Sequence, residues 1–111
     1  MPIILTDENF EKEIQRPDKM VLVDFYATWC EPCSILAPIL EKLEKEFEEK
    51  IVLLKANVDD TQLNAQKFQA DRIPRVVLFK NGKPISAFTG LIPESAIREW
   101  LEKMVQGNMP S

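Results

Sequence analysis

Apolar runs alternate with mixed stretches along this chain, and the apolar runs predict strands. Residues 20–27, 51–58 and 75–80 are almost continuously apolar and include many β-branched and aromatic side chains. Such runs are typical of strands buried on both faces of a sheet. Residues 3–5 form a shorter apolar run, which predicts an edge strand.

A hairpin is predicted around residue 81. Asn81-Gly82 directly follows the run 75–80, and Asn-Gly is a strong signal for a two-residue turn between antiparallel strands. The second strand is expected over residues 84–89. It begins with Pro84, whose missing N–H is tolerated on an edge strand.

Two helices are predicted in the first half of the chain. Thr6, followed by acidic residues, is expected to cap a helix that runs to about Gln15 and is ended by Pro17. Residues 33–50 carry apolar side chains at helical spacing, with Glu and Lys on the other face. Pro38 removes a backbone hydrogen bond inside this second helix and is expected to kink it.

Two further helices are predicted in the second half. Residues 59–69 indicate a short helix built around Leu63 and Phe68. Residues 93–105 form an amphipathic pattern, and Gly107 is expected to terminate that helix.

The order of these elements predicts one α/β domain over residues 1–111. A strand–helix–strand crossover over residues 20–58 joins parallel strands and is expected to be right-handed, whereas the later hairpin is antiparallel. The result is a mixed central sheet of about five strands, flanked on both faces by about four helices. With 111 residues, of which 45% are apolar, the chain can bury about two-thirds of its unfolded surface.

Charge and terminal sequence exclude several classes of function. The chain has 18 acidic and 14 basic residues, a net charge of −4, and no basic block that would indicate nucleic-acid binding. No segment has the length of a membrane span. The N-terminus lacks the basic and apolar regions of a signal peptide, so the sequence predicts a cytoplasmic protein.

Both cysteines of the chain lie in Trp29-Cys30-Glu31-Pro32-Cys33. A disulfide that closes so short a loop contributes only about 2 kcal/mol by chain entropy. A zinc or iron–sulfur site normally needs four ligands, and the chain has no His and no third Cys. A reversible dithiol/disulfide centre is therefore favoured. A passive local disulfide and half of a metal site shared between chains are the alternatives.

The chain resembles the thioredoxin family through a series of motifs in order. Beside the cysteine motif, these are Val23-Asp24-Phe25, Ala37-Pro38-Ile39-Leu40, Asn57-Val58-Asp59, Ile73-Pro74, Leu78-Phe79-Lys80-Asn81-Gly82 and Gly90. The resemblance implies a thioredoxin-like fold and a small thiol–disulfide oxidoreductase that reduces protein disulfides. It further implies no metal and no bound cofactor, a monomer, and re-reduction by a flavin-dependent reductase.

The position of each cysteine predicts its role. Cys30 is expected at a helix N-terminus, where unpaired N–H groups and the helix dipole stabilise a thiolate, so Cys30 is the predicted nucleophile. Cys33, one turn further in and less exposed, is predicted to resolve the mixed disulfide. Pro32 stiffens the first turn without the loss of a hydrogen bond. Trp29 is interpreted as a packing residue, a substrate contact or both.

Asp24 and Lys55 interrupt apolar strands. A buried carboxylate is costly unless it is paired, and its pKa is often raised. By resemblance, Asp24 lies behind Cys33 and moves its proton, with Lys55 as a neighbour that modulates it. From the residues alone, an outward-facing or capped Asp24 is equally compatible.

The resemblance implies a substrate surface around a proline loop. In the family this proline is cis and packs against the disulfide, and the backbone before it pairs with an extended substrate segment. The corresponding residues are Ile73, Pro74, Arg75 and Gly90, together with Trp29. The alternative is an ordinary trans proline that opens a strand.

Departures from the family pattern cluster at this site. Glu31 and Arg72 replace common glycines, Arg75 replaces a common threonine, and Tyr26 replaces a common tryptophan. Glu31 should raise the pKa of the Cys30 thiol, because its carboxylate repels the Cys30 thiolate. The two arginines are expected to offset this rise in pKa or to redirect partner choice. A chance distribution of surface charge is the alternative. Two other functions stay open: a disulfide oxidase or isomerase, with a high reduction potential, and a binding module that works without its cysteines.

Overall fold

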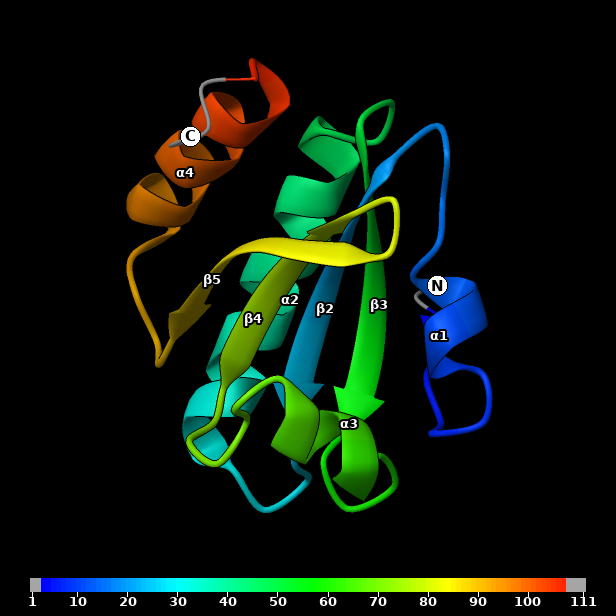
Figure 1. The fold of residues 1–111 in the computed structure, drawn as a ribbon. Helices are drawn as coiled ribbons and strands as arrows, with labels where there is room; N and C mark the ends of the chain where they lie inside the picture. The colour runs from blue at the N-terminus through cyan, green and yellow to red at the C-terminus, as the bar shows by residue number, and fades with distance from the viewer. Residues whose placement is uncertain (1–2, 108–111) are drawn as a thin grey trace.

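The computed structural model describes residues 3–107, which form an α/β fold with a five-stranded mixed sheet and four helices (Figure 1). This is the architecture predicted from the sequence. The strands are β1 (Ile3–Ile4), β2 (Met20–Tyr26), β3 (Ile51–Asn57), β4 (Arg75–Lys80) and β5 (Lys83–Thr89). The helices are α1 (Phe10–Glu13), α2 (Glu31–Glu46), α3 (Gln62–Lys67) and α4 (Glu94–Val105).

The strand order is β1-β3-β2-β4-β5, with the first three strands parallel and the last two added antiparallel. The predicted crossover from β2 through α2 to β3 therefore joins parallel neighbours. Its register places Asp24 directly beside Lys55. β1 and β5 form the two edges, so Pro84 lies on an edge strand, as predicted.

The β4–β5 turn has the geometry that Asn-Gly predicts. Asn81 and Gly82 have φ angles of 52° and 79°, and a type I′ turn requires positive φ at both central positions. A Cβ atom at Gly82 would lie 2.9 Å from Cγ of Gln15. The positive φ favours glycine at this position, whereas the exposed Gln15 side chain could move away from a Cβ atom.

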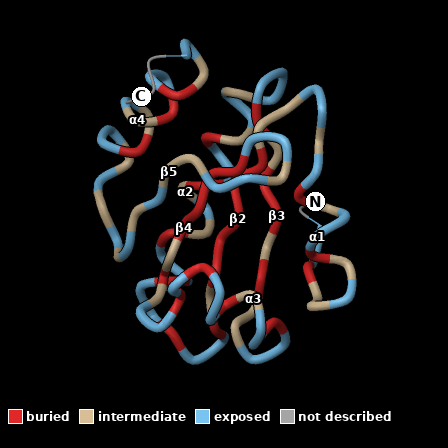
Figure 2. Tube along the Cα trace, viewed as in Figure 1, coloured by how far each residue is buried: buried red, intermediate tan, exposed pale blue. Residues whose placement is uncertain are grey.

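Helices cover both faces of the sheet, and each face has its own apolar core. Figure 2 shows long buried stretches in the central strands β2, β3 and β4. On the face of α1 and α3, four aromatic rings pack with centroids 5.0 to 6.4 Å apart: Phe10, Phe25, Phe68 and Phe79. On the other face, α2 and α4 contribute Leu36, Leu40, Leu43, Ile97 and Leu101.

Helix α2 begins at Glu31, two residues before the predicted start. Pro32 fits its first turn, where no backbone N–H needs a partner, and Cys30 is the N-cap. The helix ends at Glu46 rather than near residue 50, because the Phe47 carbonyl accepts hydrogen bonds from the next turn, which leads into β3. Pro38 lies inside α2, and the helix continues on both sides of it.

The N-terminal helix is much shorter than predicted. Only Phe10–Glu13 is helical, because Thr6 and Asn9 close a separate turn before it. The Asn9 N–H donates to Thr6 Oγ1 at 3.1 Å, and the Thr6 N–H donates to Asn9 Oδ1 at 2.7 Å. Thr6 thus accepts the i+3 N–H as a capping residue does, but the regular helix begins only after Asn9, which is its N-cap, so the predicted start is wrong.

Helix α3 receives its N-terminal cap from a distant residue. Asp7 accepts hydrogen bonds from the backbone N–H groups of Leu63 and Asn64, both at 3.2 Å, and from the Asn64 amide at 2.8 Å. Partial burial opposes ionisation of Asp7, but these hydrogen bonds outweigh it and lower its pKa. Phe68 is buried as predicted, whereas Leu63 is 72% exposed and does not anchor the helix.

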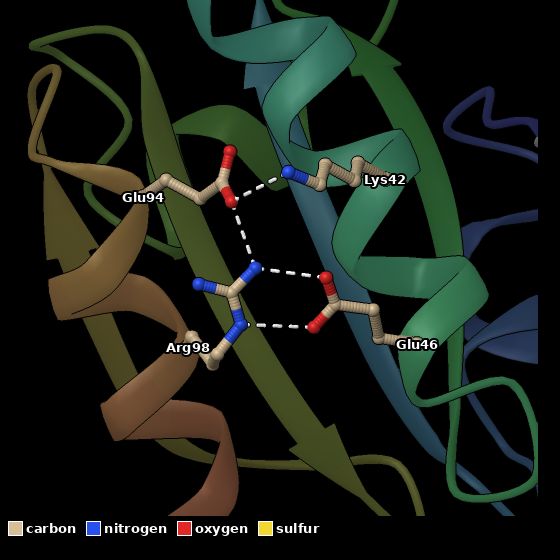
Figure 3. Close-up of polar contacts among 4 residues, drawn as sticks. All are labelled: Lys42, Glu46, Glu94 and Arg98. Atoms are coloured by element: carbon tan, nitrogen blue, oxygen red, sulfur yellow. Dashed lines mark hydrogen bonds and ion pairs between the residues drawn. The ribbon is translucent and has the colours of Figure 1, made fainter.

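Ion pairs connect α4 to α2 (Figure 3). Arg98 binds both carboxylate oxygens of Glu46, at 2.8 and 2.9 Å, and also Glu94 at 2.7 Å. Lys42 reaches Glu94 at 2.9 Å. The hydrogen bonds from Arg98 lower the pKa of both carboxyl groups. Both Arg98 and Lys42 are thus paired with carboxylates of these two helices.

Candidate active site

The predicted site residues gather at one end of the sheet. The arrowheads of β2 and β3 point to this end, where α2 begins (Figure 1). In open α/β sheets, sites form at the carboxyl ends of the strands. Ala27, Cys30 and Cys33 make a small buried cluster there, against which Tyr26, Val58 and Ile73 pack. Three segments far apart in the sequence therefore meet at the cysteines.

A disulfide joins Cys30 and Cys33, whose Cα atoms are 5.3 Å apart. Cys30 is the N-cap of α2, and its Sγ accepts a hydrogen bond from the Cys33 N–H at 3.3 Å. An N-cap sulfur at the positive end of a helix is in a position that stabilises a thiolate. The two residues differ little in exposure, at 7% for Cys30 and 3% for Cys33. Helix position distinguishes them more clearly than exposure does.

The proline loop lies against this cluster. The Ile73–Pro74 peptide bond is cis, as the resemblance implies, so the trans alternative is wrong. Ile73 packs against the cysteines, and Pro74 is buried. The Gly90 N–H donates to the Pro74 carbonyl at 2.7 Å, which brings the end of β5 to the same loop.

Asp24 is fully buried in β2. Lys55 Nζ lies 3.0 Å from Asp24 Oδ2, and the same ammonium lies 4.8 Å from the centre of the Tyr26 ring. Apart from this contact with Lys55, neither carboxylate oxygen has a hydrogen-bond partner among the described residues. Burial raises the pKa of Asp24, Lys55 opposes this only in part, and the charge of Glu41 adds to it. An outward-facing Asp24 is therefore excluded.

Trp29 and Asp59 form a contact that sequence reasoning missed. The Trp29 side chain is 70% exposed, and its indole Nε1–H donates to Asp59 Oδ2 at 3.2 Å. Asp59 lies two residues after the end of β3, so its position near the carboxyl end of a parallel strand was an available signal. Because Trp29 is so exposed, the interpretation of it as a pure packing residue is wrong.

The charged residues that depart from the family pattern do not pair with one another. Arg75 Nε donates to the Phe68 carbonyl at 3.0 Å, and Arg75 Nη1 donates to Thr89 Oγ1 at 3.0 Å. Glu31 and Arg72 are exposed. Among residues 3–107, neither arginine forms an ion pair with Glu31. Compensation of Glu31 by direct pairing is thus absent from this structure.

Comparison with known proteins gives a consistent result. The family model described as Thioredoxin matches residues 1–103. The chain belongs to the thioredoxin family. It is 40% identical to the thioredoxin of Rickettsia bellii over 91% of this chain and 96% of that protein. It is 41% identical to the thioredoxin of Staphylococcus haemolyticus over 89% and 93%, and 37% identical to thioredoxin 2 of Chlorobaculum tepidum over 90% and 92%.

Family membership and the Cys30–Cys33 disulfide establish a dithiol–disulfide oxidoreductase. The thioredoxin fold places this redox pair at the start of α2, beside the proline loop. Within residues 3–107, no group of three or more potential metal ligands occurs. In the same range, no helix is long and apolar enough to cross a membrane.

Glu31 offers a direct test of electrostatic tuning of the Cys30 thiol. Replacement of Glu31 with Gln should speed alkylation of Cys30 by iodoacetamide a few-fold at pH 7, because the repulsion between the carboxylate and the thiolate is removed. The gain should be smaller than the thiolate population alone implies, since nucleophilicity falls with the thiol pKa. The measurement is a pH–rate profile of the reduced protein.

Glu49→Gln is the matched control, because Glu49 is also exposed but lies beyond the far end of α2. Its profile should match that of the wild type. Identical profiles for Glu31→Gln and the wild type would show that Glu31 does not tune the thiol.

Proposed function

We propose that the protein reduces disulfide bonds of other proteins, with Cys30 as the nucleophile and Cys33 as the resolving residue. The observation that carries this assignment is the N-cap position of Cys30, whose Sγ accepts the Cys33 N–H. In the reduced protein, this N–H and the helix dipole would stabilise a thiolate on Cys30. Cys33 lies in the first turn of the same helix, within reach of that sulfur.

The exchange proceeds in two balanced steps. The Cys30 thiolate attacks one sulfur of the substrate disulfide, which breaks the substrate S–S bond and releases one substrate thiolate. The Cys33 thiolate then attacks Cys30 Sγ in the mixed disulfide and expels the second substrate thiolate. Two electrons pass from the cysteine pair to the substrate, and the Cys30–Cys33 disulfide is formed.

Asp24 is proposed to accept the proton of Cys33 in the second step. Burial raises the pKa of Asp24, and a carboxylate with a raised pKa is a stronger proton acceptor than an ordinary one. Lys55, 3.0 Å away, is proposed to modulate the charge of Asp24. Both residues act behind the redox pair and do not contact substrate.

Substrate is proposed to bind across the surface that surrounds the disulfide. The exposed Trp29 supplies an apolar contact, and the backbone at Ile73 and Pro74 pairs with an extended segment of the substrate. Gly90 supports the loop through its bond to the Pro74 carbonyl. Arg75 is proposed to contribute its charge at the same edge.

The Cys-Glu-Pro-Cys motif is proposed as a tuned variant within the family, with Glu31 and Pro32 setting the reactivity of the helix end. We propose a monomer of a single domain that works in the cytoplasm, where it contributes to redox homeostasis and electron transport. Its electron donor would be a thioredoxin reductase that depends on a flavin. No metal or bound cofactor takes part, because the cysteine pair itself carries the electrons.

Two measurements test this function. The reduced protein should catalyse the reduction of insulin, and its reduction potential against glutathione should lie near the value of about −270 mV that is typical of thioredoxin. A potential near about −120 mV would instead indicate a disulfide oxidase. Absence of insulin reduction, with binding of partners that survives loss of both cysteines, would indicate a binding module.

A further inference from the structure

Charge is distributed unevenly along this chain. Residues 61–93, which contain α3, β4 and β5, carry five cationic side chains and one acidic side chain, a net charge of +4. The rest of the chain carries nine cationic and seventeen acidic side chains, a net charge of −8. The five cations are Lys67, Arg72, Arg75, Lys80 and Lys83. None of them forms an ion pair within the described part of the chain.

Two of these cations line a groove between the end of α3 and β5. The groove has a volume of about 460 Å³, and Lys67 and Arg75 are its charged residues. Val77, Pro84 and Ala87 provide apolar surface along it, and no acidic side chain of the described residues lines it. β5 is an edge strand of the sheet (Figure 1). The groove therefore combines an apolar surface with uncompensated positive charge.

The Arg75 side chain is held in place before any ligand arrives. Its Nε donates to the Phe68 carbonyl and its Nη1 to Thr89 Oγ1, both at 3.0 Å. Its Nη2 has no acceptor among the described residues. A guanidinium fixed by its own hydrogen bonds loses little conformational entropy when it binds a carboxylate. Arg75 thus presents a preorganised donor to the groove.

The groove begins close to the redox site. Arg75 directly follows Pro74 and lies two residues, or at most about 7 Å of extended chain, from Ile73. Ile73 packs against the cysteine cluster. From Arg75 the groove follows β4 and β5 away from the cysteines toward Pro84. A substrate strand that reacts at Cys30 could therefore extend over the groove within a few residues of its cysteine.

We propose that this groove, which we call the Lys67–Arg75 groove, binds an acidic extended segment two to four residues from the reactive cysteine of protein substrates. The inference rests on the proposed function and names its substrate class. The net charge of −4 disfavours acidic ligands in general. A preference for acidic substrates must therefore come from local positive charge.

Peptide disulfides test this directly. A short extended peptide with one cysteine is made in three versions, which carry two Glu, two Gln or two Lys residues. These residues stand two and four positions from the cysteine. Each peptide is oxidised to its disulfide-linked dimer. Each version is made in two orientations, one with these residues before the cysteine and one with them after it. The reduced protein is mixed with each in a single turnover at pH 7, and each rate is divided by the rate with dithiothreitol to remove intrinsic reactivity.

The Glu peptide should react about threefold to fivefold faster than the Gln peptide in about 20 mM salt, in the range expected for exposed ion pairs. This ratio should approach one near 300 mM salt because of screening. Lys67→Gln and Arg75→Gln should each reduce the ratio, and Lys67→Glu should shift the preference to the Lys peptide. Lys103→Gln, the same charge change in the last turn of α4, should leave the ratio unchanged.

A ratio of the Glu-peptide rate to the Gln-peptide rate of one or less in low salt, in both orientations of the peptide, would contradict the proposal that the Lys67–Arg75 groove binds acidic segments. So would an equal effect of Lys103→Gln and Lys67→Gln, because net charge alone would then explain the data. Failure to reduce any of the peptides, the neutral one included, would instead contradict the proposed reductase function on which the inference rests.

Discussion

Replacement of Cys30 with Ser should reduce insulin reduction to the background rate without protein, whereas replacement of Cys33 with Ser should trap the substrate. The reason is the division of roles at the start of α2. Cys30, the N-cap, is placed to form the attacking thiolate, and Cys33 is needed only to release the product. The Cys33→Ser variant should therefore accumulate a covalent one-to-one complex with a disulfide substrate, seen by non-reducing electrophoresis and mass spectrometry.

The double variant, with serine at both positions, controls for non-covalent capture and should form no complex that survives denaturation. Dithiothreitol should release the substrate from the Cys33→Ser complex. Trapping by Cys30→Ser instead of Cys33→Ser would reverse the assignment. The small difference in exposure between the two residues makes this experiment decisive.

Replacement of Asp24 with Asn should stabilise the oxidised protein at pH 7, by on the order of 1 to 3 kcal/mol. Asp24 is fully buried and its pKa is raised, so the native state holds a proton more tightly than the unfolded state does. The contribution of Asp24 to the free energy of unfolding of the wild type should thus be most favourable below the unfolded pKa of about 4. It should fall as the pH rises through the folded pKa.

All other titrating groups should contribute equally to the pH dependence of the two proteins. The free energies of unfolding should therefore differ only through the titration of Asp24. The difference in the free energy of unfolding between Asp24→Asn and the wild type should shrink toward a constant minimum as the pH approaches 4. Denaturation is measured with the Cys30–Cys33 disulfide intact, which keeps the thiols from titrating. A variant that is less stable than the wild type at pH 7 and above would show that the pair with Lys55 outweighs the burial of the charge.

The same variant tests the role of Asp24 in proton transfer. Asn cannot accept the Cys33 proton, so decay of the mixed disulfide should slow at pH 7 while formation of the mixed disulfide is little changed. The defect should diminish at higher pH, where Cys33 ionises without help. A merely structural role for Asp24 would leave the pH dependence of resolution unchanged.

Much of the fold could be predicted from local pattern. The buried strands were predicted by continuous apolar runs, and the β4–β5 turn by Asn81-Gly82, because strand burial and turn geometry depend on residues close together in sequence. The cysteine spacing was likewise enough to predict the redox pair that Cys30 and Cys33 form. Family resemblance supplied the cis bond before Pro74, which no local pattern would have indicated.

Other features depended on contacts between distant segments. The N-terminal helix begins only at Phe10, after a turn that Thr6 and Asn9 close, and Asp7, one of the acidic residues that follow Thr6, caps α3. Leu63 fits an apolar pattern but points outward, because a helix as short as α3 packs through few positions. Local periodicity cannot reveal which distant polar group will accept hydrogen bonds from the unpaired N–H groups at the start of a helix.

At the site, the sequence by itself determined the chemistry, and the tertiary structure decided its surroundings. Cys30, Cys33 and the helix that follows them are contiguous, so their mutual geometry was set by local helix formation. Three contacts at the site join different parts of the fold. They are the hydrogen bond from Trp29 to Asp59, the ion pair of Asp24 with Lys55 and the hydrogen bond from Arg75 to the Phe68 carbonyl. Such contacts exist only once the sheet order brings those elements together, because hydrogen bonds and ion pairs act over a few ångströms and depend on distance in space rather than in sequence.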